Sequence, residues 1–131
     1  MKTFEPVPEE IEVLAKQVID AAFKVHTALG PGLLESAYEA CLERELTLRD
    51  IAFKSQVSLP VAYEGVSLDV GFRLDLLVAD KLIVEIKAVE KPNPLFEAQL
   101  LTYLKLTNLR LGLLINFNSI LIKDGIRRIV R

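Results

Sequence analysis

The spacing of hydrophobic residues changes once along the chain, from a helical period to an alternating one. Between residues 11 and 46 the apolar residues recur every three or four positions, which is typical of amphipathic helices. Between residues 70 and 89 they occupy every second position, which is typical of strands. Helix faces and sheet faces must then be buried against one another, so the pattern predicts a mixed α/β domain.

Three helices are expected. The first should start at the glutamates that follow Pro8, because acidic residues suit the positive end of a helix dipole, and run to about residue 28. Gly30-Pro31-Gly32 should end it sharply. The second helix is expected over residues 33–49 and the third over residues 95–106.

Five strands are expected between and after the helices, over residues 57–63, 70–78, 82–89, 111–117 and 120–130, the last interrupted at Asp124-Gly125. The order is therefore α-α-β-β-β-α-β-β. There is no internal repeat and no linker, and 131 residues are the length of one ordinary domain. We therefore expect a single domain over residues 1–131.

Composition excludes several kinds of chemistry. With one cysteine, Cys41, and one histidine, His26, the chain cannot build a Cys/His zinc site or a disulfide framework by itself. It contains no sequence typical of phosphate-binding loops or of serine hydrolases. Sixteen Lys and Arg against eighteen Asp and Glu give a net charge of −2, so bulk electrostatics does not predict DNA binding. A role with nucleic acid would have to come from a local site.

Hydropathy gives two further expectations. The N-terminal residues contain no apolar run typical of a signal peptide, and no apolar stretch is long enough to span a bilayer, so we expect no membrane association and a cytoplasmic location. Mean hydropathy is nevertheless +0.33, which is high for a small domain. We expect the excess apolar surface to be buried in a homo-oligomer, most simply a homodimer.

Polar residues interrupt the two strands expected over residues 70–78 and 82–89, which should pair as a hairpin. Asp75 lies in one strand, and Glu85 and Lys87, which are two positions apart in the next, point to the same face. One interpretation is an ordinary antiparallel hairpin with a solvated face. The other is a divalent-metal site, because carboxylates are hard oxygen ligands that suit Mg²⁺ and a nearby lysine can act on water or phosphate. The alternation alone favours the solvated hairpin, but the later helix and strands should cover this face, and a covered group of Asp, Glu and Lys would need compensation.

Asp75 followed by Glu85-Ile86-Lys87 resembles the D…(D/E)-x-K signature of the PD-(D/E)XK nuclease superfamily. Longer segments are similar to the GxxExxY family within that superfamily, and the similarity extends from about residue 11 to residue 130. The segments that carry it are VHTALGPGLLESAY at 25–38, EIKAVE at 85–90, EAQLLTYLK at 97–105 and LLINF at 113–117.

This resemblance implies a restriction-endonuclease-like fold with a mixed central sheet flanked by helices. It implies that Asp75, Glu85 and the backbone carbonyl of Ile86 bind the metal, and that Lys87 serves the attacking water or the scissile phosphate. It also implies that Glu35 reaches the metal. Two further residues match its helical Q-x-x-x-Y pattern, Gln99, which we expect in the catalytic set, and Tyr103.

Several of these residues have a simpler structural interpretation. Glu35 is in the first turn of its helix, where the helix dipole favours a carboxylate. Gln99 could be a satisfied polar group of the core. Asp50 stands at a helix end where glycine is expected, and aspartate tolerates the left-handed conformation of such a position. Asn118 stands where the family tends to have glycine. The basic residues Lys123, Arg127, Arg128 and Arg131 could touch phosphates or protect an exposed edge strand.

The leading hypothesis is a Mg²⁺-dependent phosphodiesterase, a nuclease that acts on DNA rather than RNA, with Mn²⁺ as a possible substitute for Mg²⁺. The alternative is a non-catalytic assembly or adaptor protein that keeps the nuclease scaffold, because a fold does not fix a function. An enzyme acting on a small phosphorylated metabolite is a third possibility.

Overall fold

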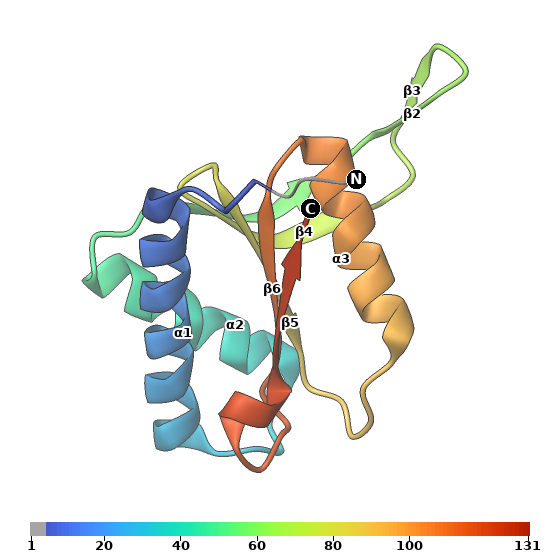
Figure 1. The fold of residues 1–131 in the computed structure, drawn as a ribbon. Coiled ribbons are helices and arrows are strands. Elements are labelled where there is room, and N and C mark those ends of the chain that lie inside the picture. The colour runs from blue at the N-terminus through green and yellow to red at the C-terminus, as the bar shows by residue number, and fades with distance from the viewer. Residues whose placement is uncertain (1–4) are drawn as a thin grey trace.

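A five-stranded mixed sheet separates two helices on one face from a third helix on the other (Figure 1). The structure, a computed structural model, describes residues 5–131. Helices α1 (Glu9–Leu29) and α2 (Glu35–Leu48) come before the first strand in the sequence. Helix α3 (Pro94–Thr107) comes between the third and fourth strands of the sheet along the chain. The mixed α/β fold class predicted from the sequence is confirmed.

The sheet has the strand order β1-β4-β5-β6-β7. Strands β5 and β6 are parallel and α3 connects them, whereas every other neighbouring pair is antiparallel. The five strands are β1 (Phe53–Ser58), β4 (Arg73–Val78), β5 (Leu82–Lys87), β6 (Leu111–Asn116) and β7 (Ile126–Val130). The two central strands, β4 and β5, carry the polar residues of interest.

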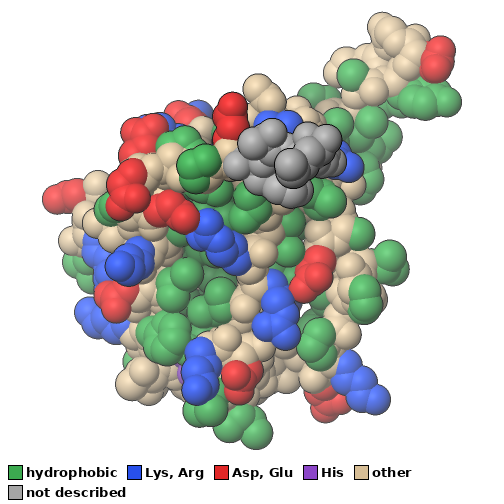
Figure 2. Space-filling view, in the orientation of Figure 1, with side chains coloured by type: hydrophobic (Ala, Val, Ile, Leu, Met, Phe, Trp, Pro, Cys, Tyr) green, Lys and Arg blue, Asp and Glu red, His purple; other side chains and the backbone are tan. Residues whose placement is uncertain are grey.

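Strand boundaries differ from the expectation at three places. The strand expected over residues 57–63 is wrong, because β1 ends at Ser58 and a separate strand, β2 (Val61–Tyr63), begins after Pro60. Proline lacks an N–H group and cannot continue a hydrogen-bonded ladder. Strand β2 pairs with β3 (Val66–Leu68) in a hairpin that extends away from the sheet, and hydrophobic side chains are visible on it (Figures 1 and 2).

The second difference is at the C-terminus. In place of a strand over residues 120–130, a 3-10 turn, η1 (Ile122–Gly125), precedes β7. The strand expected from residue 70 likewise begins only at Arg73. The other helices and strands begin and end within a few residues of the expected positions, as the hydrophobic period predicts.

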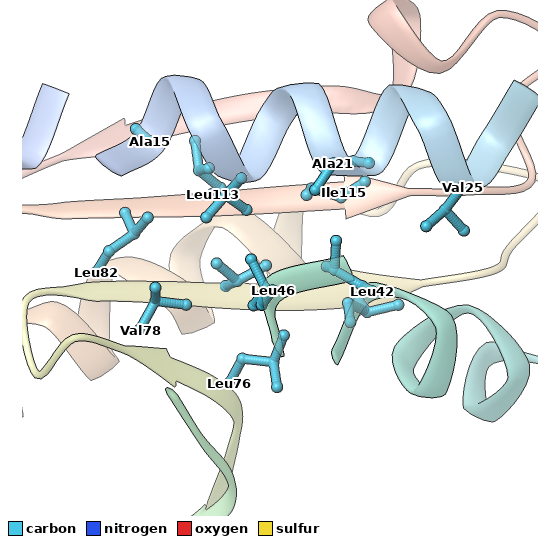
Figure 3. Packing of buried hydrophobic residues seen from close by; sticks show 14 of the residues in the cluster. Ala15, Ala21, Val25, Leu42, Leu46, Leu76, Val78, Leu82, Leu113 and Ile115 are labelled. Atoms are coloured by element: carbon cyan, nitrogen blue, oxygen red, sulfur yellow. The ribbon is translucent and has the colours of Figure 1, made fainter. Parts of the chain in front are cut away.

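The larger core lies between the sheet and the first two helices. Figure 3 shows Ala15, Ala21 and Val25 of α1 and two leucines of α2 packed against side chains of β4, β5 and β6. A second cluster lies between the opposite sheet face and α3, and includes Ile83, Leu100 and Leu114. Among the described helices, none combines the length and apolar content needed to cross a membrane.

Candidate active site

The side chains of Asp75 in β4 and Glu85 in β5 each accept a hydrogen bond from the main chain of the opposite strand. Regular pairing of β4 with β5 ends at Leu76 and Val84, so the next opposed residues are Asp75 and Glu85. There the side-chain carboxylates, in place of main-chain carbonyls, accept the hydrogen bonds between the strands. Glu85 Oε2 accepts from the N–H of Asp75 at 2.8 Å, and Asp75 Oδ2 accepts from the N–H of Ile86, also at 2.8 Å. The two carboxylates are therefore held together where the strands separate.

Glu85 is one of the few buried polar residues, with 4% of its surface exposed. Burial, followed by the neighbouring charge of Asp75, raises the pKa of Glu85 to about 8. The backbone hydrogen bond and the positive charge of Lys87 oppose this rise only in part. A buried acid beside a second acid is unfavourable when both are ionised, and a cation between them would remove that cost.

Lys87 lies on the same face of β5 as Glu85, toward α3. Its ammonium group is 4.6 Å from the centroid of the Phe96 ring, which is a cation–π distance. Its backbone carbonyl accepts a hydrogen bond from the N–H of Phe117 at 2.9 Å. Both the side chain and the main chain of Lys87 are therefore fixed by neighbours.

The main chain just after Lys87 is held by the side-chain amide of Asn116. The Asn116 Nδ2 donates to the carbonyl of Val89 at 2.9 Å, and its Oδ1 accepts from the N–H of Val89 at 3.1 Å. The same oxygen accepts from the N–H of Asn118 at 3.2 Å. This network joins the chain that follows β5, at Val89, to the turn that follows β6, at Asn118.

Helix α2 contributes two glutamates on one face. Burial raises the pKa of Glu35, Lys87 lowers it, and Asp75 raises it further. Glu39, one turn later, has its pKa raised by burial and then by Asp75, and its Oε1 accepts from Gln56 Nε2 at 2.9 Å. The first turn of α2 therefore lies within electrostatic reach of the Asp75–Glu85 pair.

Helix α3 brings Tyr103 to the opposite side of the pair. Tyr103 is buried, and its pKa is raised by burial and then by Glu85 and Asp75. Gln99 lies one helical turn earlier and is half-buried. Among the hydrogen bonds of residues 5–131, none joins the Gln99 side chain to the carboxylates.

The donor set for a metal consists of few side chains. Among residues 5–131 there is no group of three or more His, Cys, Asp or Glu side chains arranged to hold a metal ion, so Glu35 does not join Asp75 and Glu85 in such a group. The N–H of Ile86 faces Asp75, and since the two main-chain groups of a strand residue point the same way, its carbonyl faces the pair as well. Two carboxylates and one carbonyl suit Mg²⁺, which commonly keeps several water ligands.

The residues with simpler structural interpretations are accounted for individually. Asp50 adopts a φ of 56°, the left-handed conformation usually taken by glycine. Asn118 Oδ1 accepts from the N–H of Gly32 at 2.9 Å and so joins the turn before α2 to the turn after β6. His26, 9% exposed, lies 2.8 Å through its Nε2 from the carbonyl of Ser119.

Of the basic cluster, Lys123 lies exposed in η1, and Arg127 and Arg128 lie on opposite faces of the edge strand β7. Arg128 makes two hydrogen bonds to Glu12 of α1, at 2.6 and 2.7 Å. Arg127 lies on the other face, 3.7 Å through its Nε from Glu97 of α3. Arg131 donates to Asn108 Oδ1 and to the carbonyl of Leu109.

Three residues near the site were not predicted from the sequence. Glu39 could have been found, because it lies four residues after Glu35 and so shares its helical face. Asn116 lies in the LLINF segment that carries the resemblance but was given no role, and Gln56 gave no signal. The register places Gln56 opposite Asp75, and it has a φ of 51°, which is unusual within a strand.

Comparison with known families gives one match. Residues 12–129 match a family model described as the PD-(D/E)XK nuclease superfamily. The matched range contains Asp75, Glu85 and Lys87. Searches of curated proteins and of solved structures found no match.

Proposed function

Because the chain belongs to the PD-(D/E)XK nuclease superfamily, we propose that it is a metal-dependent phosphodiesterase that cleaves nucleic acid. In this proposal Asp75 and Glu85 bind the metal together with the carbonyl of Ile86. Lys87 acts on the attacking water or the scissile phosphate. The observation that carries the proposal is that two hydrogen bonds, from the N–H of Asp75 to Glu85 and from the N–H of Ile86 to Asp75, hold both carboxylates beside Lys87.

The pair has features that a purely structural role does not require. Burial and the neighbouring charge of Asp75 raise the pKa of Glu85 to about 8, so ionising both carboxylates at neutral pH is unfavourable. Each carboxylate uses one oxygen for a backbone N–H, and the second oxygen takes no part in those bonds. These remaining oxygens are the ones we assign to the metal.

Mg²⁺ is the metal we propose, with Mn²⁺ as a substitute, because both prefer oxygen ligands. When bound, the ion supplies positive charge that polarises the phosphate and favours ionisation of a water molecule. The protein's own contribution is to hold the ligands at the sheet end and to keep Glu85 away from bulk water. We also place Glu35 beside the metal, where it would reach a bound water molecule from α2.

Lys87 is suited to the phosphate side of the site. Its ammonium group is held over Phe96, and the chain after it is fixed by Asn116, so its position is constrained before substrate arrives. A positioned cation stabilises the negative charge that develops on phosphate during attack. Gln99, on the α3 side, is proposed as a hydrogen-bonding residue for the substrate or water.

We propose DNA rather than RNA as the substrate and the GxxExxY family as the closer affiliation. The net charge of −2 does not oppose nucleic-acid binding if the acidic residues of the site hold a cation, because the metal reverses the local charge where phosphate approaches. We further propose that residues 1–131 act as one domain, in the cytoplasm, as a homodimer or a larger assembly.

One observation favours the alternative, a non-catalytic adaptor on the same scaffold. Arg128 and Arg131 are engaged within the chain, which leaves little basic surface on that side for a nucleic acid. The retained Asp75, Glu85 and Lys87 oppose this alternative.

A substrate panel tests the proposal. Labelled single-stranded and duplex DNA and RNA would be incubated with the chain in Mg²⁺, in Mn²⁺ and in EDTA, and the products separated by size. We expect cleavage of DNA with either metal and none in EDTA. Absence of cleavage for all substrates and both metals would contradict the proposed nuclease activity and favour the non-catalytic adaptor.

A further inference from the structure

A cavity of about 230 Å³ lies beside Lys87, on the α3 side of the sheet. Its wall is formed by the chain after β5, the start of α3 and the end of η1. Lys87 is part of this wall, so the cavity adjoins the residue that we propose for the phosphate, whereas Asp75 and Glu85 are not among the residues that line it. Pockets for drug-sized ligands are usually 300–1,000 Å³, so this one suits a smaller group.

The lining combines apolar surfaces with positive charge. Val89, Leu114 and the ring of Phe96 give it apolar surfaces, and Lys87 and Arg127 are the basic residues among those that line it. An aromatic surface flanked by cations is the arrangement that proteins use to bind single-stranded nucleic acid, with the base against the ring and the phosphates near the cations.

Two acidic residues, Glu97 and Asp124, also line the cavity. Glu97 Oε1 is 3.7 Å from Arg127 Nε, and the two side chains are 46% and 55% exposed. Exposed pairs of this kind contribute little to stability, so Arg127 can exchange Glu97 for a phosphate at small cost. Arg127 otherwise donates to the backbone carbonyls of Asp124 and Ile126.

The part of the wall formed by Val89, Asn116 and Gly125 is fixed. Asn116 binds both main-chain groups of Val89. At Gly125 an added Cβ would collide with the carbonyl of Asn116 and with Ser119 Oγ. The cavity therefore does not depend on a loop that must first close around a ligand.

We infer that this cavity is a subsite for one unpaired nucleotide next to the scissile phosphate, with its base in the cavity and its other phosphate on Arg127. The inference rests on the proposed function and names its substrate class, which is nucleic acid with an unpaired base at the cleavage position. A stacked, paired base cannot enter without being displaced from its duplex, and that displacement weakens duplex binding.

Equilibrium binding tests this without requiring cleavage. A fluorescein-labelled 12-nucleotide DNA, single-stranded or as a duplex of the same sequence, would be titrated in EDTA and followed by anisotropy. The wild-type chain should bind the single strand about tenfold more tightly than the duplex. Equal affinities, or no binding to either DNA, would overturn the inference.

Strand β7 offers a matched pair of variants. Arg127 and Arg128 are adjacent and point to opposite faces, so Arg127→Ala and Arg128→Ala remove the same charge at nearly the same place. Arg127→Ala should weaken single-strand binding about fivefold and reduce the salt dependence of log Kd by about 0.7, whereas Arg128→Ala should change Kd less than about twofold. Equal effects of the two variants would overturn the inference.

Val89→Phe tests the cavity itself, because the larger side chain fills it. This variant should abolish the preference for the single strand, and an unchanged preference would overturn the inference. If Val89→Phe does not melt cooperatively, it is not folded, and the comparison of Arg127→Ala with Arg128→Ala then tests the inference. A chain with the predicted preference that cleaves nothing would contradict the proposed function alone, whereas equal binding with active cleavage would contradict the subsite alone.

Discussion

Asp75 and Glu85 face each other across β4 and β5, and each carboxylate accepts a hydrogen bond from the main chain of the other strand. The arrangement ends the regular pairing of the two central strands and holds two acids together at that end of the sheet. Because Glu85 is buried, the fold carries a cost at this position that a bound cation would offset. The predictions below follow from that cost and from the packing around it.

The first prediction concerns stability without metal. The pKa of Glu85 is raised from about 4.5 to about 8, so the folded state holds a proton that the unfolded state releases. Its stabilising contribution is complete below pH 4.5 and is lost as the pH rises toward 8. Glu85→Gln removes the titration, so at pH 8.5 its free energy of unfolding should exceed that of the wild type by on the order of a few kcal/mol. Urea unfolding in EDTA at pH 5 and pH 8.5 measures this, and a difference that does not grow with pH would contradict it.

The second prediction concerns metal binding. Since a metal ligand must be deprotonated, Mg²⁺ has to displace the proton of Glu85 at pH 6 but much less so at pH 8.5. The increase in Tm caused by millimolar Mg²⁺ should therefore be larger at pH 8.5. Asp75→Asn should abolish the increase at both pH values. Thermal melting of the two proteins with and without metal checks this, and the same shift in both would contradict it.

The third prediction compares two glycines that pack closely. An added Cβ at Gly125 would collide with the backbone carbonyl of Asn116, whereas at Gly112 it would meet the Leu100 side chain at 2.8 Å. A side chain can move more easily than a backbone carbonyl. We expect Gly125→Ala to lower the free energy of unfolding by about 2–3 kcal/mol and Gly112→Ala by about 1 kcal/mol. The reverse order in urea unfolding would contradict this account of the turn after β6.

The fourth prediction concerns assembly. The β2–β3 hairpin and the residues that follow it expose Tyr63, Val66, Leu68 and Val70, at 41–67% of their surface. A two-stranded hairpin is marginally stable in water by itself, so burial against another copy would stabilise it. Light scattering at micromolar concentration should give at least the mass of a dimer, and Tyr63→Ser with Val66→Ser should lower it. A monomeric mass for the wild type would contradict the prediction.

The elements that could be predicted are those whose signal is local. The helices and strands β4, β5 and β6 follow from hydrophobic spacing, and the positive φ at Asp50 is expected from its position at a helix end. The division at Pro60 was missed because the apolar residues on both sides of it read as one continuous strand. Pairing of β2 with β3 away from the sheet is a tertiary property that alternation does not encode.

The site divides in the same way. Asp75, Glu85 and Lys87 could be selected because they are polar residues in apolar strands, and the common face of Glu85 and Lys87 follows from their spacing. The two hydrogen bonds from main-chain N–H groups to the carboxylates could not be predicted, since they depend on where β4 and β5 stop pairing. The clamp by Asn116 likewise joins residues 27 positions apart, which no local pattern reveals.

The most direct test of the central claim is the initial rate of DNA cleavage in Mg²⁺ by the wild type, Asp75→Asn and Asp80→Asn. Asp80 lies in the exposed turn between β4 and β5 with a φ of 57°, which asparagine tolerates, so it controls for the loss of one charge. We predict that Asp75→Asn lowers the rate at least about a hundredfold while remaining folded, and that Asp80→Asn keeps the wild-type rate. An Asp75→Asn protein that cleaves DNA as fast as the wild type would contradict the assignment of the Asp75–Glu85 pair as the metal site of a nuclease.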